Sequence, residues 1–325
     1  MNAAPYAPRR PARARHLPLR GGQQHLLEWG DATLATPAAP TLVLLHGWMD
    51  VGASFQFVVD ELAALEGPVR HVVAPDWRGF GRSTMPPADS YWFPDYLGDL
   101  DALLRALADE APRADLADPA GAADAVGAAA VDLLGHSMGG NVVMIYAGVR
   151  PQRVRRLVNL EGFGLPASDP ADAPARLARW LDELATPVAL KSFDDADGVA
   201  AQLRRTNPRL SPAHAAWLAR EWAESRPDGR WHVRGDPAHK RSNPVPYRVD
   251  EVLAAWRAIR APTLWVDGAL TDISRWWGER YSRAEFEQRL TVVADLQRAR
   301  LAGAGHMLHH DEPAALARVL LDFLR

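Results

Sequence analysis

A glycine-bounded turn in the middle of the chain constrains its fold more than any other segment. The apolar run 128–134 is typical of a buried strand and leads directly into Gly-His-Ser-Met-Gly at 135–139, after which residues 139–149 have helical character. Glycines on both sides of the serine allow a sharp turn, because a side chain at either position would collide with the neighbouring strand and helix. The pattern therefore predicts a strand–turn–helix unit with Ser137, a candidate nucleophile, at its strained tip.

Two glycine-containing segments elsewhere supply groups that could act on such a serine. The apolar run 41–45 is followed at once by His-Gly-Trp at 46–48, and a glycine there lets the next backbone N–H groups turn toward a ligand. We therefore expect the amides of Trp48 and Met138 to form an oxyanion hole. Near the C-terminus, His306 lies on a glycine-flanked loop after a strand-like segment, so its imidazole can swing toward the serine as a general base.

Together these segments resemble the α/β-hydrolase fold family with a serine nucleophile. They occur in the order typical of that family and span about residues 17 to 325. The matching segments are His46-Gly47-Trp48, the run from Asp76 to Ser83, Gly135 to Gly140, Pro262 to Gly268 and Gly305-His306. The resemblance implies a doubly wound, mostly parallel α/β sheet with an inserted helical cap. Related dehalogenases and epoxide hydrolases carry aspartate where this chain has Ser137, which argues against both of those activities.

Three carboxylates compete for the role of the triad acid. In the α/β-hydrolase family the acid usually follows the strand represented here by residues 264–266, and Asp267 and Asp272 lie there. Asp267 is on or beside the strand end, whereas Asp272 lies on the loop that can reach His306, so we expect Asp272 to be the acid. Some family members place the acid after the preceding strand, which makes Glu161 the alternative.

The other histidines near these segments have simpler interpretations. His309 and His310 precede Asp311 and indicate the start of the terminal helix, since a zinc site would need a third ligand at defined spacing. His136 belongs to the turn and should pack beside it, too constrained to act as the base. The expected mechanism requires neither a metal nor an organic cofactor.

The order of predicted elements divides the chain into a core and an insertion. Alternating strands and helices over residues 17–162 and 250–325 predict the α/β core. The alternation stops over residues 163–249, where tryptophans among many charged residues suit a helical cap that sets substrate choice. Residues 1–16 are basic and rich in Pro and Ala, so we expect a disordered tail. The segment 111–127 is typical of a surface insertion.

Composition limits the classes of function. The formal net charge of -3 and the isoelectric point near 6.4 provide no bulk attraction to nucleic acid or to an anionic membrane. The absence of cysteine excludes disulfides, thiolate metal sites and a cysteine nucleophile. No apolar stretch approaches the roughly 18 residues of a membrane span, and no hydrophobic region follows the basic start as a secretory signal requires. We therefore expect a cytoplasmic enzyme that acts on a small molecule, with no membrane or nucleic-acid partner.

These expectations define a serine hydrolase that cleaves an ester-type bond of a small or medium apolar substrate through an acyl-enzyme. One alternative on the same triad is hydrolysis of a carbon–carbon bond in a dioxo acid, with Arg241 or Arg248 of the cap binding the substrate carboxylate. A different alternative is a catalytically silent binding protein of this fold. The intact serine and histidine argue against that, because binding alone gives no reason to keep a nucleophile at a strained turn.

Overall fold

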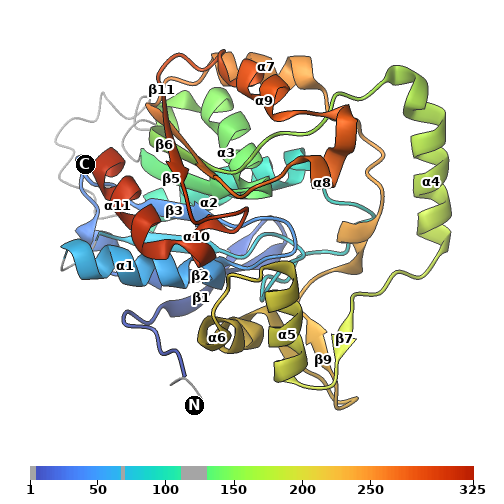
Figure 1. The fold of residues 1–325 in the computed structure, drawn as a ribbon, viewed down its shortest axis with the longest axis horizontal. Helices are drawn as coiled ribbons and strands as arrows, with labels where there is room; N and C mark the ends of the chain where they lie inside the picture. Colours follow the sequence, from blue (N-terminus) through green and yellow to red (C-terminus); the bar gives the residue numbers. More distant parts are fainter. Residues whose placement is uncertain (1–4, 67–69, 111–129) are drawn as a thin grey trace.

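A computed structural model of the 325-residue chain describes residues 5–66, 70–110 and 130–325 (Figure 1). Its centre is an eight-stranded sheet in the order β1-β2-β4-β3-β5-β6-β10-β11. From β4 to β11 along this order all neighbours pair in parallel, and β1 and β2 add an antiparallel edge. The strands are Arg13–Leu19 (β1), Gly22–Trp29 (β2), Leu42–Leu45 (β3), Val72–Pro75 (β4), Val131–His136 (β5), Val154–Leu160 (β6), Thr263–Gly268 (β10) and Leu296–Leu301 (β11).

Helices cover both faces of the sheet, because successive residues of its buried strands point to opposite sides. In β3, Val43 and Leu45 pack into one hydrophobic core, whereas Leu42 and Leu44 pack into the other. The first core lies beneath α2, α3, α7 and α9, and the second lies beneath α1 and α11 (Figure 1). These helices are Gln56–Glu66 (α1), Phe93–Glu110 (α2), Met138–Val149 (α3), Val249–Arg257 (α7), Arg283–Leu290 (α9) and Pro313–Leu324 (α11), with short helices at Ser274–Trp277 (α8) and Leu308–Asp311 (α10).

The predicted fold class, a doubly wound and mostly parallel α/β sheet, is confirmed. Parallel strands end at the same edge of a sheet, so the loops after β3, β5, β6, β10 and β11 converge there. The predicted insertion at 111–127 lies outside the described residues. Within the part of the chain that the structure describes, no helix is both long enough and apolar enough to cross a membrane.

Residues 5–16 correct the prediction of a disordered tail. β1 pairs with β2 along its whole length, and the residues before it run across α1. The carboxylate of Asp60 on α1 accepts hydrogen bonds from the Tyr6 hydroxyl (2.5 Å) and from the backbone N–H groups of Arg9 and Arg10 (3.0 and 2.9 Å). A buried carboxylate that needs donors thus anchors a segment whose composition alone is typical of disorder.

The segment 163–249, expected to be a helical cap, contains a small antiparallel sheet as well as helices. The helices are Ala173–Ala185 (α4), Ala196–Thr206 (α5) and Pro212–Trp222 (α6), and the sheet pairs Ser192–Phe193 (β7), Trp231–Val233 (β9) and Ala223–Ser225 (β8) in that order. Helix α4 stands away from the rest of the molecule in Figure 1 and buries none of its residues. In contrast, Ala215 and Leu218 of α6 pack into the core beneath α1. One part of the segment is therefore integrated into the core and another part projects from it.

Candidate active site

Ser137 lies at the turn between β5 and α3 with φ 52° and ψ -114°, a geometry that non-glycine residues rarely adopt. The flanking glycines make this turn possible. A Cβ on Gly135 would lie 2.2 Å from the carbonyl oxygen of Gly139, and a Cβ on Gly139 would lie 2.2 Å from that of Leu45. Backbone packing therefore holds the serine at the carboxyl edge of the sheet, in the strand–turn–helix unit that the sequence predicts.

Three side chains form a continuous line of contacts at this edge. His306 Nε2 lies 3.0 Å from Ser137 Oγ, and His306 Nδ1 lies 3.0 Å from Glu161 Oε2. The other carboxylate oxygen, Glu161 Oε1, accepts a hydrogen bond of 2.7 Å from the backbone N–H of Gly268. A carboxylate beside Nδ1 favours the tautomer with its proton on Nδ1, which leaves a lone pair on Nε2 to accept the serine proton. The arrangement can therefore generate a serine nucleophile.

Burial controls the protonation of Glu161 and His306. Glu161 is 1% exposed, and burial raises the pKa of its carboxyl to about 8, although the Gly268 N–H favours the ionised form. Burial also lowers the pKa of His306 to about 4, even though 26% of its side chain remains exposed. Both shifts arise because a desolvated site opposes charge on either group. Near neutral pH the two groups therefore share one proton, and its loss leaves the imidazole free to act as a base.

The structure brings Glu161, and not Asp272, to the imidazole. Glu161 directly follows β6 with φ 56°, so a left-handed turn directs its carboxylate toward the loop after β10. Asp272 is exposed on that loop, where its Oδ1 accepts hydrogen bonds from the Ser274 backbone N–H (3.0 Å) and hydroxyl (2.6 Å). These bonds lower the pKa of Asp272 and hold its carboxylate within its own turn. The expectation that Asp272 contacts His306 is therefore corrected.

Three further residues considered from the sequence are engaged elsewhere. Asp267 is buried and forms ion pairs of 2.5 and 2.9 Å with two arginines, so it is not available to an imidazole. Arg241 lies 3.9 Å from the carboxylate of Asp89 and donates to the same residue's carbonyl oxygen. Arg248 lies 3.6 Å from Glu251 on the surface. Both cap arginines thus lie near acidic partners of their own.

The two expected oxyanion donors follow neighbouring strands. Met138 is the first residue of α3, and the first N–H groups of a helix have no acceptor within it. Trp48 follows β3, which pairs with β5 in the sheet. A Cβ on Gly47 would lie 3.2 Å from the Cβ of Ser137, so the peptide leading to Trp48 adjoins the serine. Both segments thus lie beside the nucleophile, as the glycine pattern predicts.

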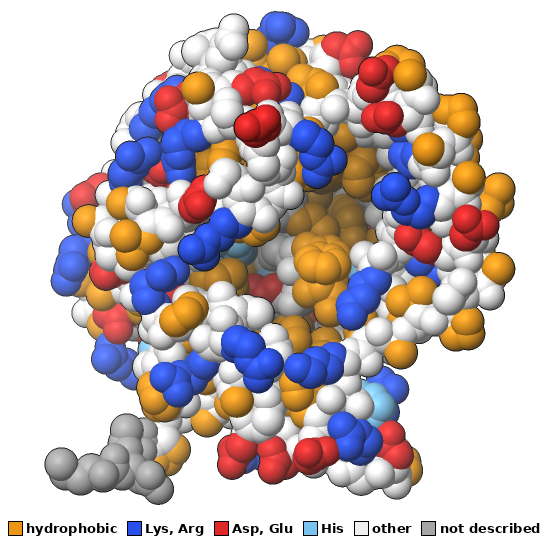
Figure 2. All heavy atoms as spheres, turned by 45° about the vertical axis from the view of Figure 1, so that its right-hand side comes forward, with side chains coloured by type: hydrophobic (Ala, Val, Ile, Leu, Met, Phe, Trp, Pro, Cys, Tyr) orange, Lys and Arg blue, Asp and Glu red, His pale blue; other side chains and the backbone are white. Residues whose placement is uncertain are grey.

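Exposed aromatic side chains lie beside the triad. Trp276 is 43% exposed, and its ring centroid lies 4.5 Å from that of His306. Trp48 is 52% exposed and donates from its indole N–H to the carbonyl oxygen of His239. Figure 2 shows a hollow with largely hydrophobic walls on the side that carries α4, with Lys and Arg side chains around its rim. Trp276 was not predicted from the sequence, although a tryptophan pair on the loop after a predicted central strand was an available signal.

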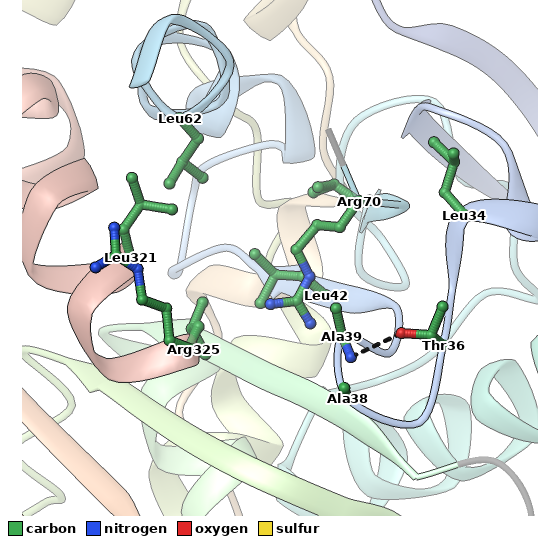
Figure 3. A pocket seen from close by; sticks show the side chains of 11 residues that line it. Leu34, Thr36, Ala38, Ala39, Leu42, Leu62, Arg70, Leu321 and Arg325 are labelled. Carbon is green, nitrogen blue, oxygen red and sulfur yellow. Dashed lines mark hydrogen bonds between the residues drawn. The ribbon is translucent and has the colours of Figure 1, made fainter. Parts of the chain in front are cut away.

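A separate cavity of about 390 Å³ lies at the opposite edge of the sheet (Figure 3). Its lining includes Leu42 and Val72 at the starts of β3 and β4, Leu62 of α1 and Leu321 of α11. Ser137 follows the end of β5, so the length of the strands separates this cavity from the triad. The cavity therefore does not belong to the candidate active site.

Comparisons with known proteins agree with this fold. The model of the alpha/beta hydrolase fold family matches residues 40–313. The chain is 32% identical over 304 residues to 3-hydroxybutyrate-oligomer hydrolase of Cupriavidus necator, covering 89% of each protein. It is 23% identical to a serine hydrolase-like protein of Danio rerio, covering 98% of this chain and 90% of that protein. The solved thioesterase domain from the curacin biosynthetic pathway matches with a TM-score of 0.76 and 26% identity, over 95% of this chain and 99% of that domain. This chain belongs to the α/β-hydrolase fold family.

Proposed function

We propose that this enzyme is a serine hydrolase of carboxylic esters, with Ser137 as nucleophile, His306 as general base and Glu161 as the triad acid. The observation that carries the proposal is the pair of 3.0 Å contacts that joins these three side chains in one line. The strained backbone of Ser137 supports it, because strain of this kind persists where the surrounding structure requires it and is concentrated at active sites.

In the proposed mechanism, Ser137 Oγ attacks the ester carbonyl carbon while His306 Nε2 takes the hydroxyl proton. Glu161 orients the imidazole and stabilises the imidazolium that forms. The backbone N–H groups of Trp48 and Met138 stabilise the negative charge on the carbonyl oxygen. The imidazolium then protonates the leaving alcohol, and a water molecule activated by the same imidazole releases the acid from the acyl-enzyme.

The substrate class that we propose is a short, linear ester with a small or medium apolar acyl chain. An apolar chain is supported by the exposed ring of Trp276 against His306, by the exposed ring of Trp48, which follows Gly47 beside Ser137, and by the hydrophobic hollow of Figure 2. The relative from Cupriavidus necator is named for 3-hydroxybutyrate oligomers, which are short linear esters. The Lys and Arg side chains around the hollow suit the single carboxylate at the end of such an oligomer.

A substrate panel with matched variants tests this proposal. Wild-type chain and Ser137→Ala would be assayed on p-nitrophenyl esters from acetate to palmitate, on 3-hydroxybutyrate dimer and trimer, on an acyl thioester and on a dioxo acid. We expect the highest kcat/KM on the short esters and loss of several orders of magnitude in Ser137→Ala, which should also lose labelling by a fluorophosphonate. Turnover of the dioxo acid alone, or esterase activity that survives the serine substitution, would contradict the proposal.

A further inference from the structure

A cluster of buried polar side chains lies behind the triad and takes no part in the proposed mechanism. It comprises Asp50 from the loop after β3, His136 at the end of β5 and His309 in α10. One potential ligand atom from each residue lies within 4.8 Å of those of the other two. The three residues are 7%, 2% and 0% exposed. Distant parts of the sequence thus meet in one buried site, which supplies the additional ligands that the sequence around His309 lacked.

The hydrogen bonds of the two histidines leave one ring nitrogen of each without a partner. His136 Nε2 lies 2.7 Å from the carbonyl oxygen of His306, which can only accept, so His136 carries its proton on Nε2 and a lone pair on Nδ1. His309 Nε2 lies 3.2 Å from the hydroxyl of Ser54. Among the described residues, His136 Nδ1 and His309 Nδ1 have no hydrogen-bond partner.

The third member of the cluster is a buried acid that lacks a matching charge. Asp50 Oδ1 accepts from the backbone N–H of Val51, but Asp50 Oδ2 has no hydrogen-bond partner among the described residues. Its ion-pair contact within that part of the chain is His309 Nε2 at 3.7 Å, and it forms no ion pair there with a lysine or an arginine. An uncompensated carboxylate is costly to bury, so a cation at this position would offset the cost.

We propose that Asp50, His136 and His309 bind a divalent transition-metal ion of the zinc class. Two imidazoles and one carboxylate are a donor set that Zn²⁺ takes in proteins, with a fourth position open to water. The remote N–H of His136 bonds to a backbone carbonyl, which is the usual support of a metal-bound histidine. Because that carbonyl belongs to His306, the bound ion would stabilise the position of the loop that carries the base. No step of ester hydrolysis involves the ion.

Metal titration of the full-length, chelator-treated chain tests this site independently of any hydrolase activity. We expect one Zn²⁺ per chain by calorimetry, a tetrahedral Co²⁺ absorption spectrum, and a higher Tm in the presence of Zn²⁺. Asp50→Asn, which preserves the shape of the side chain, and His309→Gln should each weaken Zn²⁺ binding by about a hundredfold or more, because losing a ligand costs at least as much as losing its supporting group. Circular dichroism would confirm that both variants fold.

Two control variants locate the ion. His232 forms an exposed pair with Asp228 that could bind metal adventitiously, and His232→Ala should leave the Zn²⁺ affinity within about twofold of wild type. His306→Ala should also retain the ion, because the triad is not the proposed site. Absence of stoichiometric binding to wild type, wild-type affinity in Asp50→Asn, or loss of the ion in His306→Ala would each overturn the proposal.

Discussion

Glu161→Gln separates the two carboxylates that compete for the role of the triad acid. One oxygen of Glu161 accepts from the Gly268 N–H at 2.7 Å, and the glutamine oxygen must keep this place because an amide NH₂ there would oppose another donor. The NH₂ group is then directed at His306 Nδ1, 3.0 Å away in the wild type. The ring must consequently carry its proton on Nε2, toward Ser137, in the tautomer that cannot accept the serine proton.

The expected loss follows from two costs of this change. Restoring the productive tautomer of His306 would require the glutamine amide to turn over, which directs its NH₂ group at the Gly268 N–H and leaves buried donors unpaired, at about 1–3 kcal/mol. Losing the charged partner of a buried imidazolium costs about 3–5 kcal/mol. Since each 1.36 kcal/mol is tenfold in rate, we expect kcat to fall by roughly 10³-fold or more, in line with the roughly 10⁴-fold known for the corresponding amide change in a serine protease.

The assay is kcat and kcat/KM on one activated short ester, after circular dichroism and Tm measurements show that the variant folds. Asp272→Asn is the matched control, and because Asp272 is exposed and bonds only within its own turn, its activity should stay within about twofold of wild type. A Glu161→Gln enzyme that keeps more than about a tenth of wild-type kcat, or a severe loss in Asp272→Asn, would refute the assignment of the acid.

Three further outcomes are expected. The kcat/KM of wild type should rise with pH through an apparent pKa near 8, the value to which burial raises the pKa of Glu161, because the active pair must lose its shared proton. In Glu161→Gln this rise should occur at lower pH, since burial lowers the pKa of His306 and no carboxylate shares its proton. Identical pH profiles for the two enzymes would contradict this expectation. Tyr6→Ala should lower the free energy of unfolding by about 2 kcal/mol in urea titration, through lost aromatic packing and the lost bond to the Asp60 carboxylate. Gly135→Ala should lower Tm and remove most activity, because its Cβ would meet backbone, whereas Gly198→Ala in α5, with 3.4 Å to its nearest neighbour, should leave activity unchanged and should not lower Tm.

The sequence predicts the elements of the core well, because each carries a local pattern. Strands such as 42–45 and 72–75 are short apolar runs, and the turn at Ser137 is bounded by glycines because the packing leaves no room for a side chain there. The identity of the acid depends instead on contacts between distant loops. A positive φ at Glu161 has no signature in a non-glycine residue. A local signal did exist at Asp272, because an aspartate commonly accepts a hydrogen bond from the backbone N–H two residues later, here that of Ser274, and so stays within its own turn.

The N-terminal segment was mispredicted for a different reason. Composition is informative about disorder only when a segment lacks specific partners, and the partner of Tyr6 lies 54 positions away, at Asp60. The polar cluster at His309 was missed in the same way, since Asp50 and His136 come from other parts of the chain. Contacts that depend on the tertiary fold leave no periodic trace in a single sequence.

The contacts of Tyr6 also affect how the enzyme could be recombined with its relatives. Its ring packs edge-on against Phe57 of α1 and against His214 and Trp217 of α6, at centroid distances of 5.1, 4.7 and 5.5 Å. The first described residues thus fasten α6 to the core, so the segment between β6 and α7 is attached by more than its two linkers. A chimaera that grafts this whole segment from a homologue must therefore exchange the N-terminal residues with it, whereas a graft limited to α4 can leave the leading segment and any tag fused to it untouched.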